Sequence, residues 1–171
     1  MKKIVIFDFD GVFWDSEYIW VSSLCHILEH YRKNITLPRA FNMFAGTSYK
    51  TKRDIILEKY GIDISDPKNK EMIKTKEKEL LRGVTLTDGM EKVLSYLDDI
   101  GVQMCIATGA PLNAALSRLQ KWGLERYFSS SNIVTAKDIE LFGGKDKPKP
   151  DIFLYAVKQM GYQPEFGYRR F

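Results

Sequence analysis

Short runs of apolar residues alternate along this chain with stretches in which apolar positions recur every three or four residues. A short apolar run bounded by turn residues is typical of a strand buried on both faces of a parallel sheet. Three such runs occur, at residues 4–7, 102–107 and 132–135. Amphipathic stretches predict helices over residues 90–100, 111–122 and 151–160, and the polar stretch 137–150 predicts a loop. Strands that alternate with helices predict an α/β fold with a Rossmann-like parallel sheet.

The stretch between the first two predicted strands has helical spacing throughout and no strand signal. Asp15 and Ser16 can cap its first helix, and Gly61 and Gly83 can end two later helices. An all-helical stretch inside an α/β pattern indicates an inserted domain. We therefore expect a core of residues 1–16 and 83–171, with a helical insertion at residues 17–82.

Composition narrows the class of protein. The chain has 171 residues, of which 44% are hydrophobic and 28% charged, as in ordinary globular proteins large enough to bury a core. The net charge of +4 weakly favours anionic ligands and does not indicate nucleic-acid binding. The two cysteines, Cys25 and Cys105, do not suggest a disulfide framework, and no signal peptide or membrane-length apolar stretch is found. These features predict a cytoplasmic protein without a nucleic-acid or membrane partner, and they do not indicate an oligomeric state.

Two aspartates, Asp8 and Asp10, directly follow the first predicted strand, and Gly11 permits a turn after them. Side chains i and i+2 of an extended chain point the same way, with Cα atoms roughly 6 to 7 Å apart. Carboxylates this close raise each other's pKa unless a cation neutralises them. A metal ion or another cationic group is therefore expected beside this pair.

The other two predicted strands also end in polar residues. Thr108 and Gly109 follow the second strand, and Lys145, Lys147 and Lys149 follow the third. Parallel strands bring their carboxyl ends to one edge of the sheet, where α/β proteins bind ligands. A carboxylate there can attack phosphorus while a hydroxyl, backbone N–H groups and an ammonium hold the remaining oxygens. The combined set predicts a site for a metal ion and a phosphate.

The ordered motifs DFDGV, CIATG and KPKPD resemble those of the haloacid dehalogenase (HAD) superfamily of aspartate-nucleophile phosphatases. They are most similar to members with a helical cap after the first motif, such as phosphoglycolate phosphatases and β-phosphoglucomutase-like enzymes. The likeness covers residues 1 to about 165. It implies a HAD-like core with a helical cap, and a Mg²⁺-dependent hydrolase that acts on a small phosphorylated metabolite through an aspartyl-phosphate.

The resemblance also implies roles for four residues of the core. Asp8 matches the nucleophile and Asp10 the acid/base, and both contact Mg²⁺, Asp10 through its backbone carbonyl. Thr108 matches the residue that binds the phosphoryl oxygens. Lys147 matches the lysine that steadies the nucleophile and the phosphate charge, although Lys145 or Lys149 could take that place if the register differs.

Three further positions concern the substrate. Gly109 is implied to contact it in the core, and Gly46 and Thr47 match a cap loop that closes over it. The aspartate at position 10 favours phosphoryl transfer, because dehalogenases and phosphonatases of the superfamily lack it. A mutase is expected to carry arginine where Tyr49 stands. A phosphatase is therefore the first expectation and a phosphosugar mutase the alternative.

The resemblance predicts one element that the chain does not show. Members of the superfamily continue with a further strand beside the first one, ending in an acidic pair that completes the Mg²⁺ site. Here no aspartate follows Asp151, Glu165 lies too early, and the last residues read FGYRRF. We expect an exposed edge on the first strand and fewer carboxylates for Mg²⁺. A truncated, frameshifted, engineered or naturally degenerate protein with little or no turnover is the third hypothesis.

Overall fold

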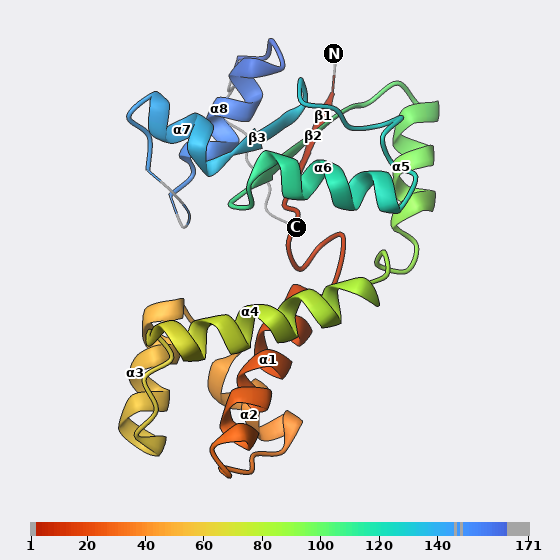
Figure 1. Ribbon diagram of the computed structural model, residues 1–171. Helices are drawn as coiled ribbons and strands as arrows, with labels where there is room; N and C mark the ends of the chain where they lie inside the picture. Colours follow the sequence, from red (N-terminus) through yellow and green to blue (C-terminus); the bar gives the residue numbers. More distant parts are fainter. Residues whose placement is uncertain (1–2, 146, 148, 164–171) are drawn as a thin grey trace. The chain divides into compact units, whose positions relative to one another are not determined.

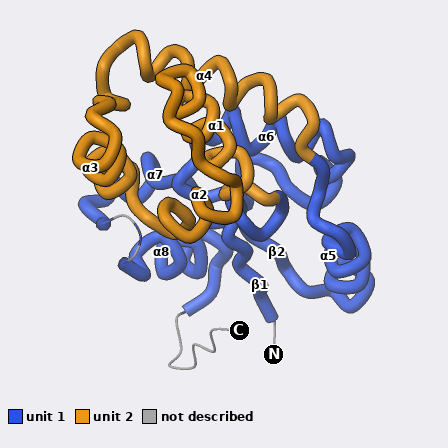
Figure 2. The backbone as a smooth tube through the Cα atoms, turned by 90° about the horizontal axis from the view of Figure 1, so that it is seen from below, with its two compact units in different colours: residues 1–14, 85–171 blue, residues 15–84 orange. Residues whose placement is uncertain are grey.

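The computed structural model describes residues 3–145, 147 and 149–163 (Figure 1). Glu165 and the segment FGYRRF, which entered the sequence analysis, lie outside the described residues. The chain divides into two compact units (Figure 2). The first, here called the α/β unit, comprises residues 1–14 and 85–171; the second, the helical unit, comprises residues 15–84.

The α/β unit contains a parallel sheet whose order, over the described residues, is β1-β2-β3. Its strands are β1 (Ile4–Phe7), β2 (Gln103–Thr108) and β3 (Ile133–Thr135). Phe7 pairs with Ile106, and Thr108 pairs with Thr135. The predicted α/β fold with a Rossmann-like parallel sheet is therefore confirmed, and each strand lies within one residue of its predicted range.

The prediction that β1 is buried on both faces was wrong. All four of its residues are only partly buried, whereas β2 is buried from Met104 to Thr108. The reason is position in the sheet: β2 lies between two strands, and β1 pairs with β2 alone among the described strands. An apolar run indicates a strand, but its burial also depends on neighbours that the local sequence does not specify.

Helices lie on both faces of the sheet (Figure 1). They are α5 (Met90–Asp99), α6 (Leu112–Lys121), α7 (Ala136–Leu141) and α8 (Asp151–Gln159). Side chains alternate along the strands, so that one face packs against α7 and α8 in a buried cluster. The cluster consists of Cys105, Ala107, Val134, Ile139, Ile152 and Ala156. Helices α5 and α6 contact β2 and β3 from the opposite face (Figure 1).

The prediction of a loop over residues 137–150 was wrong in its first part, where helix α7 (Ala136–Leu141) forms. The Asp138 carboxylate accepts hydrogen bonds from the backbone N–H and the hydroxyl of Thr135, both at 2.7 Å. This contact between the N-cap residue and the first turn starts the helix. The sequence contained the signal, Thr-x-x-Asp, in a stretch too short for a helical period to emerge.

The helical unit consists of α1 (Ser16–His30), α2 (Leu37–Phe44), α3 (Tyr49–Tyr60) and α4 (Pro67–Arg82). As predicted, the Asp15 carboxylate caps α1, accepting from the Tyr18 N–H at 3.0 Å, and Gly61 ends α3 at φ +69°. Helix α1 packs against α2 and α4 around buried Ile27, Leu28 and Phe44. None of the helices in the described ranges combines the length and the apolar character needed to cross a membrane.

Candidate active site

A lysine from a distant segment of the chain donates hydrogen bonds to groups at the carboxyl ends of both β1 and β2. Asp8 directly follows β1, and Lys147 lies between α7 and α8. Lys147 Nζ donates to Asp8 Oδ1 at 2.7 Å and to the carbonyl of Ala107 at 3.1 Å. Because Phe7 and Ile106 are paired, Asp8 and Ala107 follow adjacent positions of the two strands. The predicted cationic group beside the aspartates is thus present as an ammonium.

Asp8 and Lys147 remain accessible, with side chains that are 41% and 27% exposed. Asp8 Oδ1 also accepts the backbone N–H of Phe9 at 2.7 Å, so two donors hold the same oxygen. The Lys147 ammonium lies 5.2 Å from the centre of the Phe153 ring, which supports its position through a cation–π contact.

The other two candidate lysines are placed differently. Lys145 is exposed, and its backbone N–H donates to the Asp151 carboxylate at 2.7 Å. Lys149 is also exposed. Lys147 is thus the lysine of this run that contacts Asp8.

Asp10 lies in a tight turn after β1. The turn is closed by strand-like pairing of Asp10 with Trp14 and by a hydrogen bond from the Gly11 N–H to the Trp14 carbonyl at 3.0 Å. Gly11 adopts φ +78°, the left-handed conformation that glycine tolerates. Burial raises the pKa of Asp10 above its ordinary value, the nearby Asp8 charge raises it further, and Arg118 is the strongest opposing influence.

Thr108 and Gly109 form the end of β2 and the start of the following loop. Thr108 is completely buried, and its Oγ1 accepts the backbone N–H of Ala110 at 2.9 Å. Apart from Gly109 and its two neighbours in the chain, no heavy atom of the described structure lies within 4 Å of the place where a Cβ of Gly109 would stand. The loop therefore leaves open space next to its backbone, as a ligand that approaches the main chain requires.

Gly46 and Thr47, the predicted substrate contacts of the cap, lie in the helical unit between α2 and α3. Gly46 has φ +69°, and the Thr47 hydroxyl donates to the Phe44 carbonyl at 2.6 Å. These contacts shape the end of α2. A role of Gly46 and Thr47 in substrate binding stays a prediction.

The metal ligands predicted from the sequence are the two aspartates, Asp8 and Asp10. Within the part of the chain that the structure describes, no three His, Cys, Asp or Glu side chains form a group that could hold a metal ion. Mg²⁺ is often bound by one or two carboxylates together with phosphate oxygens and water. The Asp8 carboxylate and the backbone carbonyl of Asp10 would fit that mode, in which the substrate supplies part of the coordination.

Arg118, which the sequence analysis did not single out, is the strongest influence that lowers the pKa of Asp10. It lies on α6, and its guanidinium carbon is 4.5 Å from the centre of the Trp14 ring. Nothing in the local pattern of α6 distinguishes it from the other polar residues of that helix.

Cys105 is buried in β2, and burial raises the pKa of its thiol to about 11. This thiol is therefore not suited to act as a nucleophile at neutral pH.

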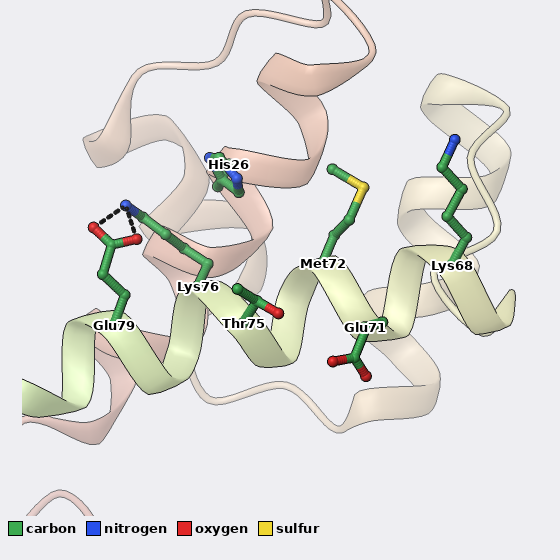
Figure 3. Close-up of a pocket in the computed structure, with 7 residues that line it drawn as sticks. All are labelled: His26, Lys68, Glu71, Met72, Thr75, Lys76 and Glu79. Atoms are coloured by element: carbon green, nitrogen blue, oxygen red, sulfur yellow. Dashed lines mark hydrogen bonds and ion pairs between the residues drawn. The ribbon is translucent and has the colours of Figure 1, made fainter.

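A separate hollow of about 420 Å³ lies in the helical unit (Figure 3). It is lined by His26 of α1 and by side chains of α4 from Lys68 to Glu79. Lys76 forms an ion pair with Glu79 at 3.0 Å, one turn further along the same helix. The hollow contains none of the residues predicted for catalysis, and its polar groups are those of a solvated helix face.

Comparisons with known proteins find relatives that are named as phosphatases. The chain is 26% identical to a phosphorylated carbohydrates phosphatase of Thermotoga maritima, over 95% of this chain and 73% of that protein. It is 28% identical to a protein named as a probable pseudouridine-5'-phosphatase of Drosophila melanogaster, over 96% of this chain and 71% of that protein.

A solved structure and a family profile give the same assignment. The structure is a conserved haloacid dehalogenase-like protein of unknown function from Agrobacterium tumefaciens, with 31% identity and a TM-score of 0.78. The match covers 96% of this chain and 71% of that one. A profile of haloacid dehalogenase-like hydrolases matches residues 5–166. The chain therefore belongs to the family of haloacid dehalogenase-like hydrolases.

Proposed function

We propose that this protein is a Mg²⁺-dependent phosphatase that hydrolyses a small phosphorylated metabolite through a phosphorylated Asp8. The observation that carries the proposal is the contact of Lys147 with Asp8 at the carboxyl ends of β1 and β2. In this contact a carboxylate and a charge-neutralising cation lie together at the edge where α/β sheets bind ligands, which supports Asp8 as the nucleophile. Relatives that are named phosphatases support the reaction class.

Asp8 attacks the phosphorus in this scheme. Because Lys147 and the Phe9 N–H both hold Oδ1, the attacking oxygen is Oδ2. The new bond joins Oδ2 to phosphorus, and the bond from phosphorus to the leaving oxygen breaks. Water then attacks the phosphorus of the aspartyl-phosphate, which releases inorganic phosphate and restores the Asp8 carboxylate.

Asp10 transfers the protons. It donates one to the leaving oxygen in the first step and accepts one from the attacking water in the second, so that it ends as it began. Burial raises the pKa of Asp10 above its ordinary value, and this direction suits a general acid.

The loop after β2 and the two aspartates hold the phosphoryl group. The Thr108 hydroxyl, which accepts from Ala110, can still donate its own proton to a phosphoryl oxygen, and the open space at Gly109 admits the group. Asp8 and Asp10 would hold Mg²⁺, which when bound neutralises charge on the phosphoryl oxygens. The helical unit would act as the cap, with Gly46 and Thr47 contacting the substrate.

The test is phosphate release from a panel of sugar phosphates, alcohol phosphates and nucleoside monophosphates, with Mg²⁺ or with EDTA. We expect release that requires Mg²⁺ and is abolished by Asp8→Asn. Asp88→Asn, which changes an exposed aspartate of the same unit, should leave release unchanged. Phosphate release by the Asp8→Asn protein would contradict the nucleophile assignment. Conversion of a sugar phosphate to its isomer without free phosphate would indicate a mutase instead.

A further inference from the structure

We propose that Arg118, held on the face of the Trp14 indole, is a positioning residue that orients the Asp10 carboxyl toward the leaving group. The inference rests on the proposed function and adds to it a residue outside the three motifs. It divides the site into two groups of residues. Lys147 holds the nucleophile Asp8, and Arg118 with Trp14 holds the acid/base Asp10.

The Trp14 indole is a fixed platform. The residue is 1% exposed, and its carbonyl accepts the Gly11 N–H at 3.0 Å. Its backbone also pairs with Asp10. A buried ring on a backbone that is tied to the catalytic turn cannot swing away without opening that turn. A side chain stacked on the ring is therefore kept near the turn that carries Asp10.

Arg118 is stacked on that platform. Its guanidinium carbon lies 4.5 Å from the ring centre, which is within cation–π range. The side chain is half-buried, and burial lowers the pKa of the guanidinium while the Asp10 carboxylate raises it again. A cation taken partly out of water needs compensating partners. The ring face and the Asp10 charge supply that compensation.

Trp14 directs a second donor toward the same carboxyl. Its Nε1–H is buried and has no hydrogen-bond partner within the described residues, and Trp14 is close enough to Asp10 to act on the pKa of that carboxyl in the lowering direction. A carboxyl oxygen of Asp10 can accept from Arg118 and from the indole N–H whether or not its other oxygen carries the proton. Their combined effect limits rotation of the carboxyl. Proton transfer needs the donor within roughly 3 Å of the leaving oxygen, so limited rotation favours catalysis.

The experiment compares two leaving groups in single-turnover measurements. One substrate is the best alkyl phosphate of the panel, whose leaving oxygen must be protonated; the other is p-nitrophenyl phosphate, whose leaving group departs as a stable anion. We expect Arg118→Gln to slow alcohol release by on the order of 10²-fold, the lower end of what general acid catalysis contributes. Release of p-nitrophenol should change little, and Arg118→Lys should recover part of the loss.

Arg126→Gln is the matched control. The Arg126 guanidinium stacks on Tyr127 at the same 4.5 Å, in the same unit. It should leave both rates unchanged. Trp14→Phe keeps a ring and removes the N–H, and we expect it to slow the alkyl phosphate alone.

The outcomes separate this inference from the proposed function. An Arg118→Gln protein that matches the wild type on both substrates would overturn the inference and leave the phosphatase assignment standing. Equal losses on both substrates would assign Arg118 a structural role and overturn it as well. A wild-type protein that is folded and hydrolyses neither substrate would overturn both.

Discussion

The ammonium nitrogen of Lys147 lies 2.7 Å from Oδ1 of Asp8, although 139 positions separate the two residues in the sequence. Both side chains are partly exposed, and ion pairs of that kind contribute only about 0 to 1 kcal/mol to stability. The chain therefore gains little stability from bringing this segment to the end of β1. The contact is better explained by chemistry, because it fixes one oxygen of the nucleophile and supplies positive charge where phosphate would bind.

The first prediction concerns Lys147. Lys147→Met should lower kcat for phosphate release by on the order of 10²-fold or more, as removal of a preorganised donor does in other enzymes. The thermal midpoint should hardly change, because an ion pair between partly exposed side chains contributes little to stability. Lys145→Met and Lys149→Met are the matched controls from the same run of lysines. A loss shared equally by all three variants would mean that general positive charge, and not this contact, supports activity.

The second prediction concerns the buried hydroxyl of Thr108. Thr108→Val preserves the shape of the side chain but leaves the Ala110 N–H without its acceptor, which should cost about 1 to 3 kcal/mol of unfolding free energy. It should also lower kcat, since the loop loses the contact that sets its conformation. Thr108→Ser keeps the hydroxyl and should retain most activity while losing about 1 kcal/mol for one buried methyl group. Chemical denaturation and steady-state kinetics measure both effects, and a fully active Thr108→Val protein would rule out the hydroxyl as a ligand for phosphate.

The sequence predicted the residues of the candidate site through one rule of α/β architecture. Asp8 and Thr108 directly follow apolar runs, so that parallel pairing alone brings them to the same edge. The choice of Lys147 over Lys145 and Lys149 was not decided by this rule, because it depends on the path of a loop. The resemblance to the superfamily favoured Lys147, and the contact with Asp8 agrees.

What could not be predicted depended on tertiary neighbours. The partial exposure of β1 follows from its single neighbour among the described strands. Its apolar sequence carries no trace of that, and the exposed edge was expected only from the resemblance to the superfamily. The position of Arg118 beside Trp14 and Asp10 requires the packing of α6 onto the sheet. Helix α7 is the opposite case, since its Thr135 and Asp138 capping signal was present in the sequence and was outweighed by polar composition.

The third prediction concerns pH and Asp10. Burial raises the pKa of this carboxyl in the folded protein above its value in the unfolded chain. The corresponding stabilisation is complete below the unfolded pKa of about 4 and is lost as the pH rises through the folded pKa. Asp10→Asn, which cannot ionise, should therefore raise the thermal midpoint at pH 7 in EDTA, with a difference that disappears below about pH 4.

Thermal unfolding at the two pH values tests the Asp10 prediction. Glu125→Gln removes an exposed carboxylate from the same unit and should leave the midpoint unchanged at both. A lower midpoint for Asp10→Asn at pH 7 would show that the folded protein stabilises the ionised carboxylate, contrary to the direction expected from burial.

The last prediction concerns a buried asparagine that links three segments of the helical unit. Asn69 is 5% exposed; its Oδ1 accepts the Tyr31 hydroxyl at 2.8 Å, and its Nδ2 donates to the Asp63 carbonyl at 2.8 Å. Asn69→Ala leaves both partners unsatisfied and should lower the free energy of unfolding by about 1 to 3 kcal/mol. Asn34→Ala, at an exposed position of the same unit, is the control.

Hydrogen exchange should locate the effect of Asn69→Ala in α1 and α4, because Tyr31 follows α1 and Asn69 lies on α4. Tyr31→Phe removes one of the two hydrogen bonds and should cost less, since the tyrosine side is partly exposed and water can replace the asparagine. A double-mutant cycle should then give a coupling of about 0.5 to 3 kcal/mol between residues 31 and 69. Additive losses would mean that Asn69 stabilises the unit through the Asp63 carbonyl alone, and the link from α1 to α4 would then rest on apolar packing.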